Sequence, residues 1–370
     1  MDLFGFVIWN GSPEIFSVPL PVIDGSLTLR WYGLLFATGF LISQQLLYYI
    51  FGKEGKPRED VDTLTVYMVV ATIIGARLGH VFFYEPDRYL ANPIDILKVW
   101  EGGLASHGAA IAILIALWLY ARKKKPGQGF MQTLDRIVIL VALTGALIRV
   151  GNFFNAEIIG KQTRSNYGVF FARPVTDILK RNDIFTDIRY VKADSITGNY
   201  PYPPIKILCK FNPEKNYEEP NMRRFLVNEV ADVMMYNARI REHISQGDFV
   251  YDLVRDEDGT WYAILSTLAV PRHPAQLYEA ASCLLLFALL FYLWSRHKAQ
   301  TRPGLLFGWF MVILWTLRFI YEFFKEPQVE FEYDLPLYMG QLLSIPFVIL
   351  GIIVLVYAYR RKPNTEHIRA

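Results

Sequence analysis

IVILVALTGALIRVGNFFNAEIIG occupies residues 137–160, and its character changes within a few helical turns. The first half is almost entirely apolar, whereas the end carries Arg149, Asn152, Asn155 and Glu157. At helical spacing Arg149 and Asn152 share a face, with Asn155 beside them, so a polar stripe follows an apolar helix. An arginine at mid-bilayer costs about 2.5–3.5 kcal/mol on insertion scales. The stretch therefore predicts a membrane helix whose stripe faces something polar.

The composition of the whole chain agrees with a membrane location. The 370 residues are 53% hydrophobic and 15% aromatic, with a mean hydropathy of +0.22. These values indicate a polytopic membrane protein that also carries soluble material. The two cysteines, Cys209 and Cys283, lie in different kinds of segment, which argues against a disulfide framework or a cysteine metal site. No basic n-region or cleavage site precedes the first apolar run, so we expect no removable signal peptide.

Seven apolar runs are each close to the ~20 residues that cross a bilayer. They lie at about 31–51, 61–84, 104–121, 133–154, 275–295, 304–325 and 339–359. The loops 52–60, 122–129 and 296–303 and the tail 360–370 carry three or four Lys and Arg each, whereas 85–103 has two and 326–338 has none. The positive-inside rule then predicts an outer N-terminus and a cytoplasmic C-terminus.

A long polar interval separates the fourth and fifth runs. Residues 204–211 have the pattern of a strand, 221–244 that of an amphipathic helix, and 249–254 with 260–265 that of a hairpin around Asp256-Glu257-Asp258-Gly259. The predicted fold is an all-α polytopic membrane protein with about seven transmembrane helices and an extracytoplasmic α+β insert. Its predicted divisions are 1–160 (helices 1–4), 161–272 (head insert) and 273–370 (helices 5–7 and a cytoplasmic tail).

Polar side chains gather at the outer ends of the predicted spans, and the cytoplasmic half has nothing comparable. They are Tyr32, Arg77, His80, Tyr84, Glu101, Ser106, His107, Arg149, Asn152, Asn155, Arg272, His273, Gln276, Tyr278, Glu279, Arg318, Glu322, Lys325 and Gln341. Intramembrane polar residues normally face a bundle interior or a wet cavity. The pattern predicts an outer-leaflet cavity lined by cations, and guanidinium groups there favour a phosphate ligand such as a phospholipid headgroup.

Each charged residue also has a simpler interpretation. Arg318, Glu322 and Lys325, at i, i+4 and i+7, are spaced to form salt bridges on one helix face. Arg77 and Arg149 are placed so that they can extend to outer phosphates without forming a site.

The remaining polar residues have simpler interpretations too. His107 fits a structural histidine, although Gly102, Gly103 and Gly108 beside it permit close backbone approach. Tyr32, Tyr84 and Trp100 fit interfacial aromatics. No His/Cys/Asp/Glu spacing indicates a metal site, and no Gly-Xaa-Ser-Xaa-Gly motif indicates a serine lipase. A phospholipid transporter or lipid-binding scaffold would use the same cavity, but the chain shows neither an internal repeat nor a polar cytoplasmic half.

Residues 149–160, RVGNFFNAEIIG, resemble the signature of the bacterial phosphatidylglycerol–prolipoprotein diacylglyceryl transferases. Six further blocks resemble those of the family, in the family's order. They are 30–33 (RWYG), 75–79 (GARLG), 100–108 (WEGGLASHG), 272–279 (RHPAQLYE), 318–324 (RFIYEFF) and 339–344 (MGQLLS). Together they cover all seven spans and leave only the insert unmatched.

The resemblance implies a bacterial inner-membrane enzyme with an outer-leaflet active site. Such an enzyme moves the sn-1,2-diacylglyceryl group of phosphatidylglycerol to the lipobox cysteine of a prolipoprotein and releases glycerol phosphate. Its expected partners are therefore phosphatidylglycerol, prolipoprotein signal peptides and the bilayer, with no cofactor, metal or nucleic acid. Family roles fall on Tyr32, His107, Arg149, Asn152, Glu157, Gly160, Tyr278, Arg318 and Glu322, and the predicted cavity adds Arg77, Asn155 and Lys325.

The chemistry of this reaction indicates which of these residues should matter most for catalysis. A free thiol has a pKa of about 8.5, so forming the thiolate at pH 7 costs only about 2 kcal/mol. Stabilising the charge that grows on the departing phosphate is typically the larger contribution. We therefore expect Arg149 and Arg318 to be catalytic, with His107 as the candidate base, and the other nine residues to bind substrate.

The chain departs from the family in three places. Lys325 stands where the family usually has arginine, which removes the fork geometry of a phosphate clamp. Ile148 stands where a small residue is frequent. The insert is longer than expected, either because it guides substrate or gates lipid, or because it is a lineage-specific addition.

Overall fold

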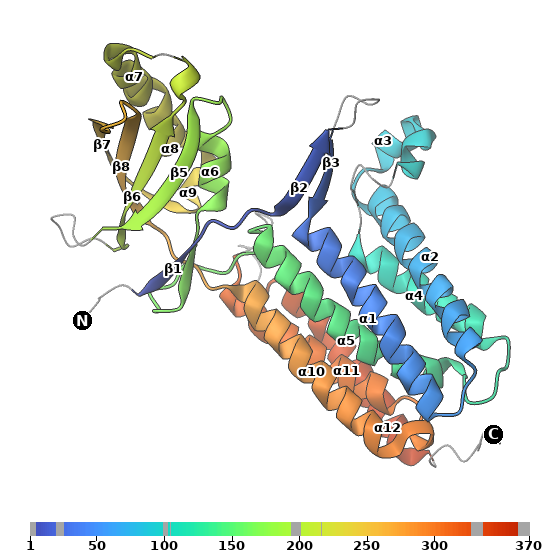
Figure 1. Ribbon diagram of the computed structural model, residues 1–370. Coiled ribbons are helices and arrows are strands. Elements are labelled where there is room, and N and C mark those ends of the chain that lie inside the picture. Colours follow the sequence, from blue (N-terminus) through green and yellow to red (C-terminus); the bar gives the residue numbers. More distant parts are fainter. Residues whose placement is uncertain are drawn as a thin grey trace. The chain divides into compact units, whose positions relative to one another are not determined.

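The computed structural model describes residues 5–19, 26–98, 103, 105–193, 201–215, 217–326 and 336–361 (Figure 1). The chain divides into two compact units, and the boundaries at 34/35, 148/149, 279/280 and 320/321 fall inside or at the end of long helices. Unit 1 comprises 1–34, 149–279 and 321–333, and unit 2 comprises 35–148, 280–320 and 334–370. Residues 99–102, which include the expected polar residue Glu101, lie outside the described part.

Seven apolar helices match the seven predicted runs to within a few residues. They are α1 (Trp31–Lys53), α2 (Arg58–Phe83), α4 (Ser106–Ala121), α5 (Phe130–Phe154), α10 (Ala275–His297), α11 (Leu305–Tyr321) and α12 (Met339–Arg360). Six are long and apolar enough to cross a membrane, whereas α4 has 16 residues. Shorter helices are α3 (Pro86–Ala91), η1 (Pro93–Leu97) and η5 (Lys298–Gln300). This architecture fits a polytopic membrane protein.

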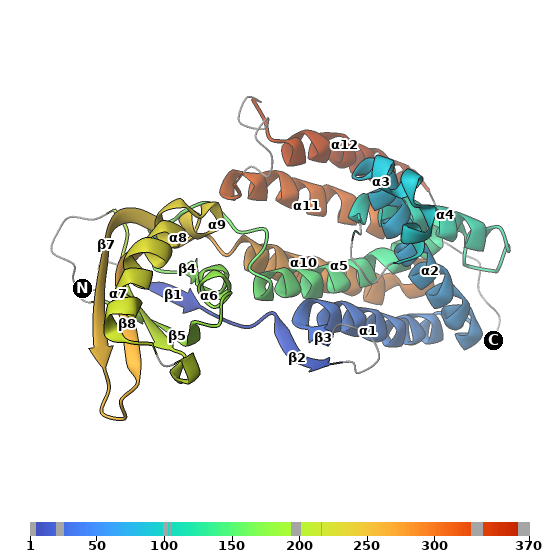
Figure 2. The same ribbon diagram turned by 90° about the horizontal axis from the view of Figure 1, so that it is seen from above.

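Glycines bring α2 and α4 together within unit 2, and the two helices lie side by side in Figures 1 and 2. A Cβ on Gly108 would lie 2.3 Å from the carbonyl oxygen of Gly75 and 2.6 Å from Cα of Gly79. Only glycine permits so close a backbone approach. The start of α4 is also fixed, because the Ala105 amide donates to the Ala76 carbonyl at 2.9 Å.

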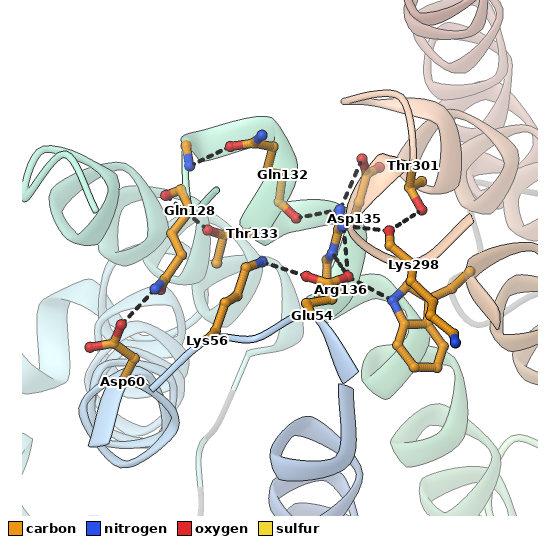
Figure 3. A network of polar contacts seen from close by, with 12 residues as sticks. Glu54, Lys56, Asp60, Gln128, Gln132, Thr133, Asp135, Arg136, Lys298 and Thr301 are labelled. Atoms are coloured by element: carbon orange, nitrogen blue, oxygen red, sulfur yellow. Dashed lines mark hydrogen bonds and ion pairs between the residues drawn. The ribbon is translucent and has the colours of Figure 1, made fainter. Parts of the chain in front are cut away.

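A buried polar network joins the end of α1 to other helices of unit 2 (Figure 3). The Glu54 carboxylate accepts hydrogen bonds from Nε of Arg136 at 2.9 Å, Nε1 of Trp294 at 2.7 Å and Nζ of Lys56 at 2.5 Å. All three charged side chains are at most 2% exposed. One carboxylate thus connects α1, α5 and α10.

The same network reaches two further helices. Asp135 on α5 accepts the backbone amides of Gly304 at 2.7 Å and Phe307 at 2.8 Å, so it satisfies free N–H groups at the start of α11. Asp60 on α2 accepts Nε2 of Gln128 at 2.5 Å. The sequence patterns gave no sign of this network, because each member is an ordinary loop or helix-end residue.

Unit 1 contains the α/β structure. Its strands are β1 (Phe6–Trp9), β2 (Glu14–Pro19), β3 (Ser26–Arg30), β4 (Gly168–Phe171), β5 (Phe185–Lys192), β6 (Pro204–Phe211), β7 (Ile244–Arg255) and β8 (Trp261–Ala269). Its helices are α6 (Arg173–Leu179), η3 (Pro213–Lys215), α7 (Glu219–Phe225), the π-helix η4 (Leu226–Val230), α8 (Ala231–Tyr236), α9 (Ala238–Arg241) and η6 (Glu322–Phe324). The strands β5-β6-β8-β7 form an antiparallel sheet, β2 pairs with β3, and β1 pairs in parallel with β4.

Helices α6 to α9 lie along one face of the four-stranded sheet (Figures 1 and 2). The core between them contains alternate residues of β6, such as Ile205, Ile207 and Cys209, packed with Leu226 and Ile240 from the helices. Alternation places one face of each strand in this core. Burial also raises the pKa of the Cys209 thiol, so this cysteine is held as a neutral core residue.

The strand and the hairpin predicted within 161–272 are confirmed. The strand at 204–211 is β6, and the hairpin is β7 and β8 around a turn in which Gly259 has φ +85°. The expected single helix over 221–244 is wrong in its continuity. Asn237 has extended backbone, and its side chain accepts the amides of Arg239 and Ile240 to begin α9. The strands β1–β3, which precede the first long helix, were not expected in an otherwise all-α protein.

Candidate functional site

Unit 1 holds the predicted residues Tyr32, Arg149, Asn152, Asn155, Glu157, Gly160, Tyr278, Glu322 and Lys325. The centre is the end of α5, where the chain leaves the helix after Phe154. Ala156 and Ile158 both have positive φ, at 51° and 56°, so the backbone turns sharply on either side of Glu157. The Glu157 amide donates back to the Asn152 carbonyl at 3.2 Å, which closes this turn.

Three separate segments of unit 1 are joined next to that turn. The Gly160 amide donates to the His273 carbonyl at 3.0 Å, and the Lys161 amide donates to the Phe324 carbonyl at 2.7 Å. Gly160 also forms an isolated bridge with Lys325. A Cβ at Gly160 would lie 2.5 Å from the His273 oxygen and 2.9 Å from the Phe324 oxygen. The last residue of the signature is therefore a glycine because two other backbones touch it.

A row of charged side chains connects the three segments that meet beside this turn. Nε of Arg149 lies 2.7 Å from Oε2 of Glu279, and Nζ of Lys325 pairs with Oε1 of the same carboxylate. Nζ of Lys325 is also 4.0 Å from Oε1 of Glu322. The Arg149 side chain is 23% exposed, compared with 11% for Glu279 and 7% for Lys325. Of the two cations that pair with Glu279, Arg149 is therefore the one that solvent or a ligand can reach more easily.

Two amides converge on one carboxylate beside these charges. Nδ2 of Asn152 donates to Oε1 of Glu157 at 2.7 Å, and Nδ2 of Asn155 donates to the same oxygen at 3.1 Å. The Glu157 carbonyl accepts Nε2 of Gln276 at 2.5 Å. Nη1 of Arg149 is 3.5 Å from Oδ1 of Asn152. The polar residues predicted at the end of α5 are therefore held in a fixed arrangement by hydrogen bonds to one another.

Aromatic residues complete this part of unit 1. Tyr32 packs on Gly151, where an added Cβ would lie 3.0 Å from Cα of Tyr32. Nδ1 of His273 is 3.2 Å from the Tyr278 hydroxyl, and the Tyr321 hydroxyl donates to the Tyr278 carbonyl at 3.4 Å. Burial lowers the pKa of His273, which favours its neutral imidazole.

Unit 2 holds the other three predicted residues, Arg77, His107 and Arg318. Arg77 is 3% exposed. Its guanidinium donates from Nε to the Ile96 carbonyl at 2.8 Å, also contacts the Asp95 carbonyl, and lies 4.8 Å from the centre of the Tyr89 ring. These contacts hold the short helices α3 and η1 in place. They are the simplest account of a buried arginine here, and the substrate-binding role of Arg77 stays a prediction.

The surroundings of His107 and Arg318 are different, because each of these side chains lies beside aromatic rings. His107 is exposed in the first turn of α4, with ring contacts to Phe83 at 5.0 Å and Tyr84 at 5.8 Å. The Arg318 guanidinium lies 5.7 Å from the centre of the Trp315 ring. Its Nε is buried and has no hydrogen-bond partner among the described residues. A buried donor without a partner is costly unless a ligand accepts from it.

Three further polar residues, for which the sequence predicted no role in the reaction, are connected to the centre, namely Arg272, Gln276 and Glu279. Arg272 is 4% exposed and donates to the Glu242 carbonyl at 2.9 Å and to the Gly160 carbonyl at 3.2 Å. All three residues lie in one sequence block, 272–279. The signal that could have identified Glu279 is electrostatic, because buried cations need an anionic partner.

The arrangement in unit 1 offers cationic and amide donors beside a partly exposed arginine. Guanidinium groups bind phosphate oxygens in pairs, so this geometry suits an anionic ligand. Among the described residues, no group of three His, Cys, Asp or Glu could hold a metal ion.

Comparison with known proteins agrees with these features. A model of the prolipoprotein diacylglyceryl transferase family matches residues 20–357. A phosphatidylglycerol–prolipoprotein diacylglyceryl transferase of Tolumonas auensis is 35% identical over 96% of this chain and 99% of its own length. Proteins of the same name are 33% identical in Chloroherpeton thalassium, over 98% of this chain and 97% of that protein, and 32% identical in Porphyromonas gingivalis, over 99% of each.

Proposed function

This chain belongs to the prolipoprotein diacylglyceryl transferase family, and we propose that Arg149 and its neighbours in unit 1 bind the phosphate of phosphatidylglycerol for that reaction. The enzyme transfers a diacylglyceryl group from phosphatidylglycerol to prolipoproteins. The acceptor in our proposal is the thiol of the lipobox cysteine. The observation that carries the proposal is the match over 20–357, which includes every block that supplies the predicted site residues.

The bond changes define what the residues must do. The cysteine sulfur forms a bond to the glyceryl carbon, the bond from that carbon to the phosphate oxygen breaks, and glycerol phosphate leaves with an additional negative charge. We assign stabilisation of that charge to Arg149 and Arg318, because donors aimed at developing charge usually contribute most to catalysis. The unpartnered Nε of Arg318 supports this role, since a phosphate oxygen would satisfy it.

The thiol proton needs an acceptor. We assign it to His107, whose exposed imidazole is the one histidine side chain among the predicted site residues. The thiolate is the nucleophile, so proton removal precedes or accompanies attack on the carbon. Glycerol phosphate is then released, and the cysteine sulfur is joined to the diacylglyceryl group by a thioether bond.

The other predicted residues orient the substrate in this scheme. Tyr32 and Asn152 donate hydrogen bonds to the headgroup, while Glu157 fixes the amides of Asn152 and Asn155. Tyr278 and Arg77 are assigned secondary contacts. To Glu322 we assign the support of Arg318, on the basis of the i, i+4 spacing of the two residues in the sequence.

We place the protein in the bacterial inner membrane with seven spans, the 16-residue α4 being the third. The lysine and arginine distribution supports an outer N-terminus, a cytoplasmic C-terminus and an active site in the outer leaflet. Residues 161–272 would then be an extracytoplasmic head between spans 1–4 and spans 5–7. A head in that place would guide the signal peptide or gate lipid.

One experiment tests the function directly. Purified protein is mixed with phosphatidylglycerol labelled in its acyl chains and with a lipobox peptide. Label should become covalently attached to the peptide and should be lost when the peptide cysteine is replaced by serine. A transporter or lipid-binding scaffold would bind the labelled lipid without modifying the peptide, and that result would overturn the proposal.

A further inference from the structure

Glu279 lies between two cations, although it was not among the residues expected to act in the reaction. Its Oε2 is 2.7 Å from Nε of Arg149, and its Oε1 pairs with Nζ of Lys325. Glu279 is 11% exposed and Lys325 is 7% exposed, so solvent screens this arrangement weakly. One carboxylate is therefore shared by a buried lysine and a partly exposed arginine, and this arrangement is less screened than a surface ion pair.

Backbone contacts fix where the Lys325 ammonium can reach. Lys325 bridges to Gly160, and the neighbouring Phe324 carbonyl accepts the Lys161 amide at 2.7 Å. The side chain is therefore tied at its base and paired at its tip, with a second carboxylate, that of Glu322, 4.0 Å away. A lysine held between two carboxylates has little capacity left for a lipid phosphate.

The geometry at Arg149 shows which part of the guanidinium is engaged. Glu279 takes the Nε edge, and Oδ1 of Asn152 is 3.5 Å from Nη1. A guanidinium has five donors in a rigid planar fork, so fixing one edge also fixes the direction of the remaining donors. That preorganisation is what stabilisation of a developing charge requires.

From these contacts we infer that Glu279 is a positioning residue, which sets the orientation of Arg149 toward the phosphate, and that Lys325 anchors Glu279 instead of binding phosphate. This inference rests on the proposed function, because the reaction supplies the phosphate. It assigns Glu279 a role in the reaction and explains how lysine serves where the family usually has arginine. Lys325 reaches the second oxygen of Glu279 with a single ammonium group, so the fork geometry of arginine is dispensable for this contact.

Charge balance gives Lys325 a second effect. An unbalanced carboxylate beside Arg149 would cancel the charge that attracts a phosphate. Lys325 adds one positive charge beside the Arg149–Glu279 pair, so Glu279 can orient Arg149 while Lys325 offsets the negative charge of Glu279. Orientation and charge are therefore separable, and substitutions can test them one at a time.

Four variants distinguish the two effects in transfer kinetics with phosphatidylglycerol micelles and a lipobox peptide. Glu279→Gln removes the anchor and leaves the net charge higher, so we expect kcat to fall at least tenfold while KM for phosphatidylglycerol stays the same or falls. Glu279→Asp keeps the charge with a shorter reach and should recover part of kcat. Lys325→Arg should keep at least a third of wild-type kcat. Lys325→Met leaves the carboxylate opposing the phosphate, so KM should rise.

The double variant Glu279→Gln/Lys325→Met decides between orientation and charge. It restores the wild-type net charge and leaves neither Glu279 nor Lys325 as a buried charge without its partner, which protects folding if a single variant proves unstable. We expect its kcat to stay within threefold of that of Glu279→Gln. Recovery to the wild-type kcat would show that charge balance alone matters and would overturn the inference, as would a normal kcat in Glu279→Gln.

Glu326→Gln is the matched control, because Glu326 is a partly exposed glutamate in the same segment that pairs with Arg272 at 3.1 Å. It should leave kcat within twofold of wild type. Equilibrium binding of labelled phosphatidylglycerol separates this inference from the proposed function. If the wild type transfers no label, the transferase proposal fails. The charge part of the inference is then still tested, because Lys325→Met should bind the lipid more weakly than wild type and Glu279→Gln should not.

Discussion

Asn152 donates its side-chain amide to Oε1 of Glu157 at 2.7 Å, across the point where α5 gives way to the turn. Asn155 donates to the same oxygen at 3.1 Å. One glutamate therefore fixes both asparagines of the signature, and the fixed amides leave their carbonyl oxygens in defined directions. In the proposed site, this relationship supports a role for Glu157 in orienting the two asparagines rather than in contacting the phosphate.

We expect Glu157→Gln to be milder than Glu157→Leu. Glutamine keeps an oxygen that accepts from one or both amides, whereas leucine leaves two amides without an acceptor, at about 1–3 kcal/mol each where they are buried. Transfer activity should fall about tenfold for the first variant and at least a hundredfold for the second. Equal activity of the two variants in the labelled-lipid assay would argue against the orienting role.

Gly160→Ala should inactivate the enzyme because it disrupts the packing of the backbone around Gly160. Its Cβ would lie 2.5 Å from one carbonyl oxygen and 2.9 Å from another, and both belong to backbone that cannot move alone. Overpacking of this kind typically costs about 1–3 kcal/mol. We expect a lower melting temperature in detergent together with loss of transfer.

The control for this substitution is Gly52→Ala. Gly52 lies in α1, and an added Cβ there would meet nothing within 4 Å. Alanine also has the better helix propensity, by about 1 kcal/mol. Gly52→Ala should be neutral or slightly stabilising, and a loss comparable to that of Gly160→Ala would show that the assay does not resolve the local clash.

His107→Gln should lower transfer by about 10²–10⁴-fold at pH 7 if His107 takes the thiol proton. The deficit should shrink as the pH rises toward about 8.5, because the acceptor thiol then ionises without help. The measurement is the pH profile of transfer for wild type and variant. Retention of most of the activity at pH 7 would exclude His107 as the base.

Folding of unit 1 should depend on pH through His243. Burial, followed by the nearby charges of Arg272 and Arg239, lowers the pKa of His243 to about 3. An unfolded histidine has a pKa of about 6.5, so between these values the unfolded chain binds a proton that the folded chain does not. Stability is therefore complete above about pH 6.5 and is lost progressively as the pH falls toward 3.

At pH 5 this difference amounts to about 2 kcal/mol of unfolding free energy. Replacing His243 by glutamine should remove that part of the loss between pH 7 and pH 5, as followed by thermal unfolding in detergent. His297→Gln is the control, because His297 is exposed near the end of α10. Identical acid sensitivity of wild type and His243→Gln would show that other groups dominate.

The buried network in unit 2 predicts a change in stability. Glu54→Gln leaves Arg136 and Lys56 without their shared anion, and breaking a buried ion pair costs about 3–5 kcal/mol. The melting temperature should fall clearly, whereas Glu59→Gln, at an exposed position in the first turn of α2, should have little effect. A Glu54→Gln protein as stable as wild type would contradict the importance of the network.

The helices were predictable because a membrane span has a simple requirement for length and apolarity. Leu305 to Tyr321 and Met339 to Arg360 follow directly from it. The pairing of β1 with β4 was not predictable, because it joins residues more than 150 positions apart and each strand has only four residues. Nothing local in such short segments specifies a partner.

The candidate site also has some residues that were predictable from the sequence and others that were not. Arg149, Asn152 and Glu157 were recognisable because polar residues in an apolar run stand out. Glu279 was visible in its block but received no role, because its importance comes from two cations that reach it from other segments. Arg77 had the profile of a ligand-binding arginine, and its backbone contacts with Asp95 and Ile96 became visible only in three dimensions.

The length of α4 has a consequence for the lipid around it. At about 1.5 Å per residue, its 16 residues are about 24 Å long, shorter than the ~30 Å hydrocarbon core of a typical bilayer. Local thinning of the bilayer is one way in which a membrane accommodates such a short helix, beside snorkelling of flanking residues and oligomerisation. On the proposed topology, such thinning would lower the outer headgroups toward His107 at the start of α4. The membrane itself would then deliver the phosphate to the depth of the reaction.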